Sequence, residues 1–366
     1  MPALPSPVAE LVPQVRLNSR RSDAAVAGRY SLCGLLMRLR NLNKWEQGLE
    51  PWREQDPGPV LEWVSRREEA WLALEGEEPQ TLTLQGRRVD PFDCRAVNQK
   101  IMPLGYIYGA GLAGGLAPVF FLGRLESSRR QEGMLVHRLG RELTQDIFFL
   151  PGLRQGSEVF LRRWPLAYLL WDKIADPRRS LARFLRFGLA GYGLSLDDLL
   201  RRPDWPSLEP VLAGEQEAVL WHELGEAGDA APAGGPLRLV LERHPGSDLE
   251  HFVRGVKDLM ADTGPRGRLA RIIRARARGA LGLYPAWLSG FPRLLFPEID
   301  AAVSDFITSG DWGEIEAVRR LGWDRARQAL ERITPYLEDE GEPDQVRLAA
   351  RQEVIAPLTG QKEDGV

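Results

Sequence analysis

The sequence has very little cysteine. Cys33 and Cys94 are the only two cysteines among 366 residues. Two thiols are too few for a disulfide scaffold, an all-cysteine iron–sulfur cluster or a structural zinc site built from thiolates. Both are expected to be buried and inert rather than nucleophilic. The scarcity of cysteine favours a reducing compartment, and we expect a cytoplasmic location.

The sequence also lacks an excess of charge of one sign. Its formal net charge is −3, with 48 basic and 51 acidic side chains. Such a balance provides no overall basic field to attract nucleic acid or an anionic membrane, so neither is an expected partner. The 43% hydrophobic and 27% charged content is typical of soluble globular proteins.

No long stretch of the sequence is purely apolar. The N-terminus has no basic start followed by an apolar core, so it does not resemble a secretory signal peptide. Residues 101–123 carry no charge over a length that could span a membrane, but they include six glycines and two prolines. Because these residues weaken helices, we expect a buried, turn-rich segment there.

Composition and hydrophobic periodicity predict a mainly α fold, a multi-helix bundle-like architecture with a small β-hairpin element in the N-terminal half. The length allows two packed units. We expect a mobile lead-in over 1–22, an α unit with β-hairpins over 23–150, an all-helical domain over 151–337, and a charged, partly disordered tail over 338–366.

Individual elements follow from spacing and from turn residues. Apolar residues recur at helical spacing in 24–43 and 59–74. A strand pair is expected in 81–93 around Gln85-Gly86, and a hairpin is expected between 119–126 and 134–139. From Gly140 onward the pattern is almost continuously helical, with helices predicted at 141–149, 156–174, 178–191, 197–202, 208–226, 235–243, 248–262, 267–281, 286–295, 299–307 and 312–336.

One glycine motif imitates a dinucleotide-binding loop. Residues 109–114, GAGLAG, fit the G-x-G-x-x-G pattern. In a dinucleotide site this turn opens a helix, but Gly115 and Pro118 follow at once and would interrupt one. A tight buried turn is the favoured interpretation.

The most chemically suggestive stretch is residues 221–226, WHELGE. On a helix His222 and Glu226 lie one turn apart on the same face, a spacing that lets imidazole and carboxylate groups converge on a metal ion, and Glu223 lies between them. The zinc-protease motif H-E-x-x-H is absent, because Glu226 stands where its second histidine would be. The alternative is an ordinary acidic helix end.

A second acidic pair, Asp258 and Asp262, is again one helical turn apart. If this helix lies antiparallel to the one that carries His222, the two sets would face each other as in helical di-metal carboxylate sites. The same carboxylate spacing could hold magnesium against a diphosphate. A solvated acidic face explains it equally well.

Arginines follow directly at spacings of three and four residues. Arg271 and Arg274 belong to this stripe and are our candidates for binding an anionic ligand. The stripe could instead form ion pairs with acidic residues of the preceding helix. We favour such structural pairing over nucleic-acid binding, since the cluster contains no interleaved aromatic residues.

Several blocks together resemble a known family. These are GRYSLCGLLMRLR at 28–40, KWE at 44–46, LGREL at 139–143, WHELGE at 221–226 and VKDLMADT at 256–263. They resemble a family of uncharacterised bacterial proteins, described as a domain of unknown function with N- and C-terminal parts. The resemblance spans about residues 20–335. It implies a shared fold and a bacterial cytosol, and it carries over no catalytic residue.

Two hypotheses for function remain. In the first, the C-terminal half binds a divalent metal ion through His222, Glu223, Glu226, Asp258 and Asp262, or an anionic ligand through Arg271 and Arg274. In the second, the chain is a non-catalytic accessory protein that docks a protein partner. Convergence of these side chains on one site would favour the first hypothesis, and mutual neutralisation in pairs would favour the second. The sequence assigns no catalytic residue, substrate or oligomeric state, and it leaves open whether the chain is an enzyme.

Overall fold

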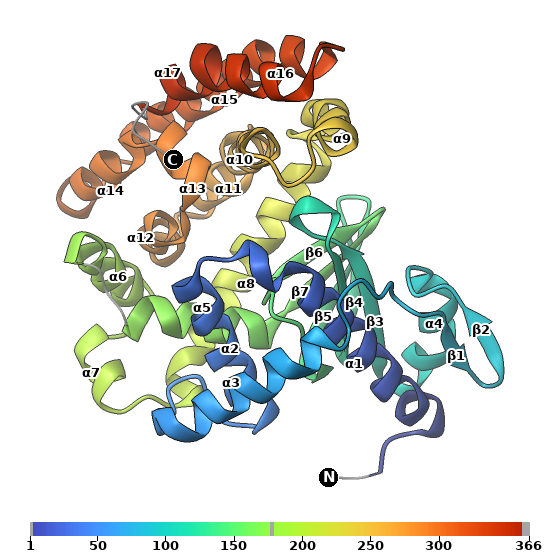
Figure 1. Cartoon of the computed structure of the whole chain (residues 1–366). Coiled ribbons are helices and arrows are strands. Elements are labelled where there is room, and N and C mark those ends of the chain that lie inside the picture. The colour runs from blue at the N-terminus through green and yellow to red at the C-terminus, as the bar shows by residue number, and fades with distance from the viewer. Residues whose placement is uncertain (1–2, 176–178, 361–366) are drawn as a thin grey trace. The chain divides into compact units, whose positions relative to one another are not determined.

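The computed structural model describes residues 3–175 and 179–360 (Figure 1). The chain divides into two compact units, Met1–Ala175 and Asp176–Val366. The boundary predicted after residue 150 lies inside the first unit, because two strands and a helix that follow it complete that unit. Parts of three predictions lie outside the described residues, namely 1–2 of the lead-in, 178 of a helix and 361–366 of the tail.

The first unit combines helices with a mixed sheet. Its helices are α1 (Ser6–Val26), α2 (Leu32–Glu46), α3 (Pro57–Leu72), α4 (Cys94–Ile101) and α5 (Arg163–Ala175). Its strands are β1 (Leu82–Leu84), β2 (Arg87–Val89), β3 (Tyr106–Leu112), β4 (Pro118–Gln131), β5 (Met134–Thr144), β6 (Gly152–Gln155) and β7 (Glu158–Arg162). Short 3₁₀ turns are η1 (Ala27–Arg29), η2 (Met102–Leu104) and η3 (Gly114–Leu116).

The mainly α class is confirmed, but the β structure is larger than the predicted small hairpin. Five strands form one sheet in the order β3-β4-β5-β7-β6, in which only β5 and β7 are parallel neighbours. The helix predicted over 141–149 is wrong, since β5 runs to Thr144 and no helix follows before residue 150. The helix predicted over 156–174 is wrong over its first part, which forms β7, and begins only at Arg163 as α5. Four of the five residues of β7 are buried, so the strand shows no polar–apolar alternation from which it could be recognised.

Both hairpins expected from the sequence are present. β1 and β2 pair around Gln85 and Gly86, and β4 and β5 pair around Glu132 and Gly133. All four turn residues have positive φ, which is the requirement of a two-residue type I′ turn. The second hairpin extends further than predicted, because polar residues 127–131 continue β4 to the turn and β5 continues past residue 139 to Thr144.

The predicted mobile lead-in is wrong for the described residues from Ser6 onward, which form α1. Val8, Leu11 and Val15 recur at helical spacing and are fully buried against residues of β3 and β4. The abundant Ser, Arg and Pro residues concealed this pattern. Pro7 occupies the first turn, where a missing N–H group costs nothing.

The two faces of the five-stranded sheet have separate cores. Tyr108 and Phe120 form a cluster with residues of α1 and α4, whereas Phe121 and Phe160 belong to a separate cluster on the opposite side. Gly109 lies in β3 rather than in the expected turn. A Cβ atom on Gly109 would lie 2.1 Å from the Phe121 ring, so glycine is required there for aromatic packing.

The second unit is helical throughout its described residues. Its α-helices are α6 (Arg179–Gly191), α7 (Leu196–Arg201), α8 (Trp205–Ala227), α9 (Gly234–Arg243), α10 (Asp248–Thr263), α11 (Arg268–Ala275), α12 (Arg278–Trp287), α13 (Gly290–Leu295), α14 (Glu298–Ser309), α15 (Trp312–Glu338), α16 (Pro343–Ala350) and α17 (Ala356–Thr359). The 3₁₀ turn η4 (Ala231–Ala233) precedes α9, and the π-helical turn η5 (Arg351–Ile355) joins α16 to α17.

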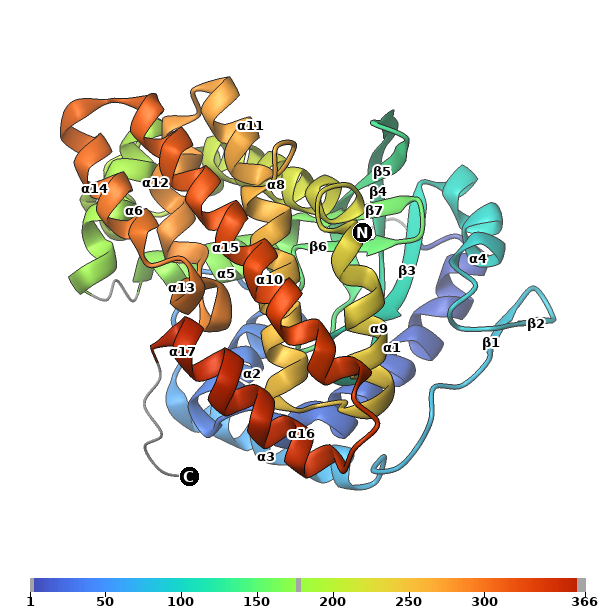
Figure 2. The same ribbon diagram turned by 90° about the horizontal axis from the view of Figure 1, so that it is seen from above.

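α10 is central to the second unit and contacts α8, α9, α11, α13 and α15 (Figure 2). Its apolar face, with Phe252, Val256 and Leu259, belongs to the main core. The tail expected to be partly disordered is helical as far as Thr359, because Ala350 and Val354 add to that core. Within the described residues, no helix combines the length and the apolar character needed to cross a membrane.

Candidate functional site

The candidate site lies where α8 and α10 run antiparallel. Along α8, His222 faces Asp262 near the end of α10, while Glu226 one turn later faces Lys257. The helices approach closely at Gly225, where a Cβ atom would lie 2.2 Å from the carbonyl oxygen of Ala261. The antiparallel arrangement assumed from the sequence is therefore present.

His222 is held by carboxylates on both sides of its ring. Its Nδ1 lies 2.8 Å from Oδ1 of Asp262, and its Nε2 lies 3.7 Å from Oε1 of Glu226. Burial disfavours the imidazolium, but the charges of Asp262 and Glu226 outweigh it and raise the pKa of His222 well above its usual value. This pKa shift favours the imidazolium form of His222 between the two carboxylates.

Glu226 and Lys257 form the second ion pair of the site, with Nζ of Lys257 in direct contact with Oε1 of Glu226. Burial acts to raise the pKa of Glu226, but hydrogen bonding to His222 and the charge of Lys257 dominate and lower it. Glu226 is therefore ionised and capable of binding a cation.

Asp258 completes a group of three potential metal ligands. One ligand atom each from His222, Glu226 and Asp258 can be chosen so that all lie within 4.8 Å of one another. The Asp258 side chain is 44% exposed, compared with 9% for Asp262. The pKa of Asp258 is raised by its partial burial and by the nearby carboxylates of Glu226 and Asp262. The charges of Lys257 and His222 act to lower this pKa but do not outweigh that effect. The outer edge of the site is accessible from solvent.

A second set of polar contacts supports the inner edge of the site. Burial acts to raise the pKa of Asp262, but the charge of His222 and, to a smaller extent, that of Arg268 lower it. The guanidinium of Arg268 also lies over the Tyr284 ring. Arg268 also pairs with buried Glu215 at 3.4 Å. Glu215 accepts hydrogen bonds from Tyr192 at 2.9 Å and from Trp287 at 2.6 Å. Glu215 therefore anchors this interior.

The other residues predicted from the sequence lie outside the three-ligand group. Glu223 is buried and follows His222 directly in α8. Because adjacent residues on a helix face different directions, Glu223 does not share the face of His222 and Glu226. Arg271 donates from Nε to the carbonyl oxygen of Arg266 at 2.7 Å, and Arg274 is exposed. The acidic and arginine candidates therefore do not form one common site.

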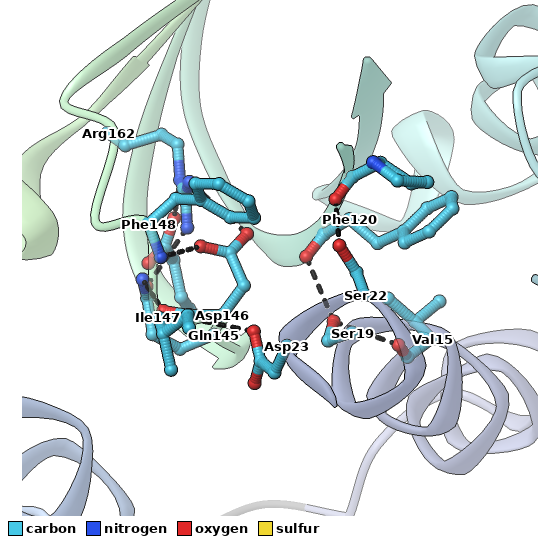
Figure 3. Close-up of polar contacts among 12 residues, drawn as sticks. Val15, Ser19, Ser22, Asp23, Phe120, Gln145, Asp146, Ile147, Phe148 and Arg162 are labelled. Atoms are coloured by element: carbon cyan, nitrogen blue, oxygen red, sulfur yellow. Dashed lines mark hydrogen bonds and ion pairs between the residues drawn. The ribbon is translucent and has the colours of Figure 1, made fainter. Parts of the chain in front are cut away.

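The first unit contains a buried ionic network that the sequence did not reveal (Figure 3). Arg162 donates to Glu142 at 2.6 Å and to Gln145 at 2.9 Å, and it lies 3.9 Å from Asp146. Asp23 of α1 accepts a hydrogen bond from the backbone N–H of Ile147 at 3.0 Å. Burial, followed by the charge of Asp146, raises the pKa of Asp23 well above its usual value.

The same face of α1 is fixed to the sheet by hydroxyl groups. Ser19 donates to the carbonyl oxygen of Phe120 at 3.1 Å, and Ser22 donates to that of Pro118 (Figure 3). These contacts join residues about 100 positions apart in the sequence, so helical spacing could not have indicated them. Only the concentration of Ser and Asp on one side of α1 provided a signal.

Comparison with known proteins gives a family but no activity. The N-terminal domain model of a family of unknown function, DUF6866, matches residues 10–162, and the C-terminal domain model of the same family matches residues 167–355. No curated protein matches the chain, and no solved structure matches it. The two matches together cover most of the sequence. The chain therefore belongs to this family of unknown function through both of its domains.

Proposed function

We propose that the second unit binds a divalent metal ion between α8 and α10. The observation that supports this most is the convergence of ligand atoms from His222, Glu226 and Asp258 within 4.8 Å. One imidazole and two carboxylates suit zinc, manganese or ferrous iron, and they leave coordination positions for water or a ligand.

The orientation of His222 agrees with this proposal. Metal-binding histidines commonly donate their other ring N–H group to a carboxylate, which fixes the tautomer. Asp262 is placed to accept such a bond from Nδ1 at 2.8 Å. Nε2, the nitrogen nearer to Glu226, then remains for the metal ion.

Lys257 would act as the counter-ion of the metal-free site. Its ammonium contacts the Glu226 carboxylate, where a metal ion would have to bind. Metal binding therefore requires Lys257 to release Glu226 and His222 to lose its proton. In return the ion neutralises carboxylates that repel one another.

The accessory-protein hypothesis also has specific support. His222 with Asp262, and Lys257 with Glu226, neutralise each other in pairs, as expected of a cluster that only joins two helices. Arg271 and Arg274 are absent from the three-ligand group, so an anionic ligand of this site has less support than a metal ion. Enzymatic activity is left open.

A cytoplasmic location is proposed with the metal site. Cys94 is a buried free cysteine as expected, whereas Cys33 is an exposed one, so the burial expected for Cys33 is wrong. A reducing compartment would keep both in this state.

Calorimetric titration of the metal-free protein with zinc and manganese tests the proposal. We expect one ion per chain for the wild type and loss of this binding for His222→Ala. His251→Ala is the matched control, because His251 is exposed on α10 and lies outside the three-ligand group. It should bind like the wild type.

Circular dichroism must show that each variant is folded. Absence of binding by the folded wild type would reject the metal proposal and favour the accessory role. Equal loss in His222→Ala and His251→Ala would show that binding is not located between α8 and α10.

A further inference from the structure

A cavity in the first unit contains a group of arginines that the family and the metal proposal leave without a role. Its volume is about 430 Å³, within the range of small-molecule sites. Side chains come from α1, the end of α2, β5 and the start of α5. Its lining includes Arg16, Arg20, Trp45, Glu46, Arg141, Glu142 and Trp164.

The cavity has an excess of positive charge. Three arginines line it, Arg16 and Arg20 from α1 and Arg141 from β5. Its two acidic residues are engaged elsewhere. Glu46 pairs with Arg67 and accepts from Trp63 Nε1 at 3.1 Å, and Glu142 pairs with Arg162 in the buried network.

Arg20 has no protein partner in the described part of the chain. No hydrogen bond or ion pair involves its guanidinium there, and its Nε is buried without an acceptor. Burial, followed by the charge of Arg67, lowers the pKa of Arg20, although Glu46 partly compensates. A partly buried cation without a partner costs stability, so an external anion would gain strong hydrogen bonds at this position.

Two tryptophans supply flat apolar surface beside these cations. Trp45 comes from α2 and Trp164 from α5, and both are partly exposed. The Trp164 indole is itself supported by the Tyr168 ring at a centroid distance of 6.4 Å. Indole faces bind planar rings by stacking, and guanidinium groups bind phosphate through paired N–H donors.

We propose that this cavity binds a phosphomonoester that carries a planar ring. The phosphate contacts Arg20 with Arg16 and Arg141, and the ring lies against Trp45 or Trp164. A phosphate is favoured over a carboxylate because its larger charge better balances three guanidinium groups. The proposal is independent of the metal site, since every lining residue belongs to the first unit.

Calorimetry and tryptophan fluorescence of the full-length protein test this proposal with defined probes. Adenosine monophosphate and phenyl phosphate carry both features. Inorganic phosphate lacks the ring, adenosine lacks the charge, and benzoate replaces the phosphate by a carboxylate. We expect the two ring phosphates to bind more tightly than the other three probes, and added salt to weaken their binding.

Arg20→Met is the decisive variant, with Arg88→Met as its matched control. Arg88 is exposed on β2 of the same unit, so the control removes the same charge away from the cavity. Arg20→Met should weaken binding of phenyl phosphate roughly tenfold or more. It should also keep or raise the melting temperature, because it removes repulsion with Arg67.

Binding of benzoate as tightly as phenyl phosphate would reject the phosphate assignment. The proposal as a whole is overturned if the folded wild type binds neither ring phosphate, or if Arg20→Met binds them as tightly as Arg88→Met does. Trp164→Leu provides a second test, since it should weaken phenyl phosphate more than inorganic phosphate.

Discussion

At the residue scale, the buried charges of the first unit differ in their partners. Arg162 is fully buried and neutralises Glu142 and Asp146, whereas Asp23 has only the backbone N–H of Ile147 within hydrogen-bonding distance and leaves Oδ2 without a donor. A buried carboxylate without a cation favours its protonated form. The structure therefore indicates that Asp23 keeps its proton at pH values where ordinary aspartates have lost it.

This difference predicts a pH-dependent effect of Asp23→Asn. An aspartate in the unfolded chain titrates near about pH 3.9. The pKa of Asp23 in the folded protein lies well above that value. At pH values between these two pKa values the folded state binds more protons than the unfolded state, so wild-type stability decreases as pH rises through this range. The amide introduced by the substitution does not titrate, so the variant should gain stability relative to wild type between these two pKa values.

Urea unfolding from pH 4 to pH 9 measures this effect. Asp56→Asn is the control, because Asp56 is exposed at the start of α3 and makes no side-chain capping bond. A constant difference between Asp23→Asn and wild type at every pH would contradict the account.

Lys257→Met separates the two interpretations of the second-unit site. If Lys257 competes with a metal ion for Glu226, its removal should destabilise the metal-free protein but tighten zinc binding by roughly tenfold. Lys100→Met, at an exposed position on α4, should change neither. Destabilisation without tighter zinc binding would support a purely structural ion pair.

The sequence located the residues of this site better than it located the first-unit network. His222 with Glu226, and Asp258 with Asp262, are each one turn apart, and helical spacing places such pairs reliably on one face. Glu142 and Arg162 meet because β5 and β7 are neighbours in the sheet. No local pattern specifies which strands become neighbours, so this network could not be predicted.

At the element scale, the site depends on how closely α8 and α10 approach. Gly225 of α8 permits contact with the backbone of α10, since a Cβ there would lie 2.2 Å from the carbonyl oxygen of Ala261. Backbone atoms cannot move aside as flexible side chains can. The short distance between His222 and Asp262 therefore depends on glycine at position 225.

Gly225→Ala should force α8 and α10 apart. We expect a loss of about 1–3 kcal/mol in the free energy of unfolding, the usual cost of overpacking, together with weaker metal binding. Gly234→Ala is the control, because no atom lies within 4 Å of the Cβ position at Gly234. Equal urea midpoints for Gly225→Ala and wild type would contradict the proposed close contact.

Helix prediction succeeded where a helix has a clear start signal. α10 begins at Asp248, the predicted first residue of that helix, and the hydroxyl of the preceding Ser247 accepts a hydrogen bond from the N–H of Glu250 at 3.2 Å. The Glu250 carboxylate accepts a hydrogen bond from the backbone N–H of Gly246 rather than from that of Ser247. The predicted helix 267–281 is instead α11 and α12, because Arg276 adopts a left-handed conformation between them.

At the scale of the whole molecule, each unit has its own hydrophobic core. The clusters around Phe120, Phe121 and Tyr168 contain only residues of the first unit, and the large cluster around Phe252 contains only residues of the second. Hydrophobic clusters that are each confined to one unit indicate two units able to fold separately.

Residues 1–175 produced alone should therefore fold. We expect a single cooperative urea transition and binding of phenyl phosphate close to that of the full chain, because every residue lining the cavity is present. A fragment without cooperative unfolding would show that the first unit depends on the second.

The central claim, that the chain holds a divalent metal ion between α8 and α10, is tested most directly by elemental mass spectrometry of the untagged full-length protein. The wild type and His251→Ala, loaded with zinc, manganese or ferrous iron and then desalted, should retain close to one ion per chain. A folded His222→Ala, Asp258→Ala double variant should retain none. A metal-free wild type after all three loadings, or equal metal in the double variant, would contradict the claim.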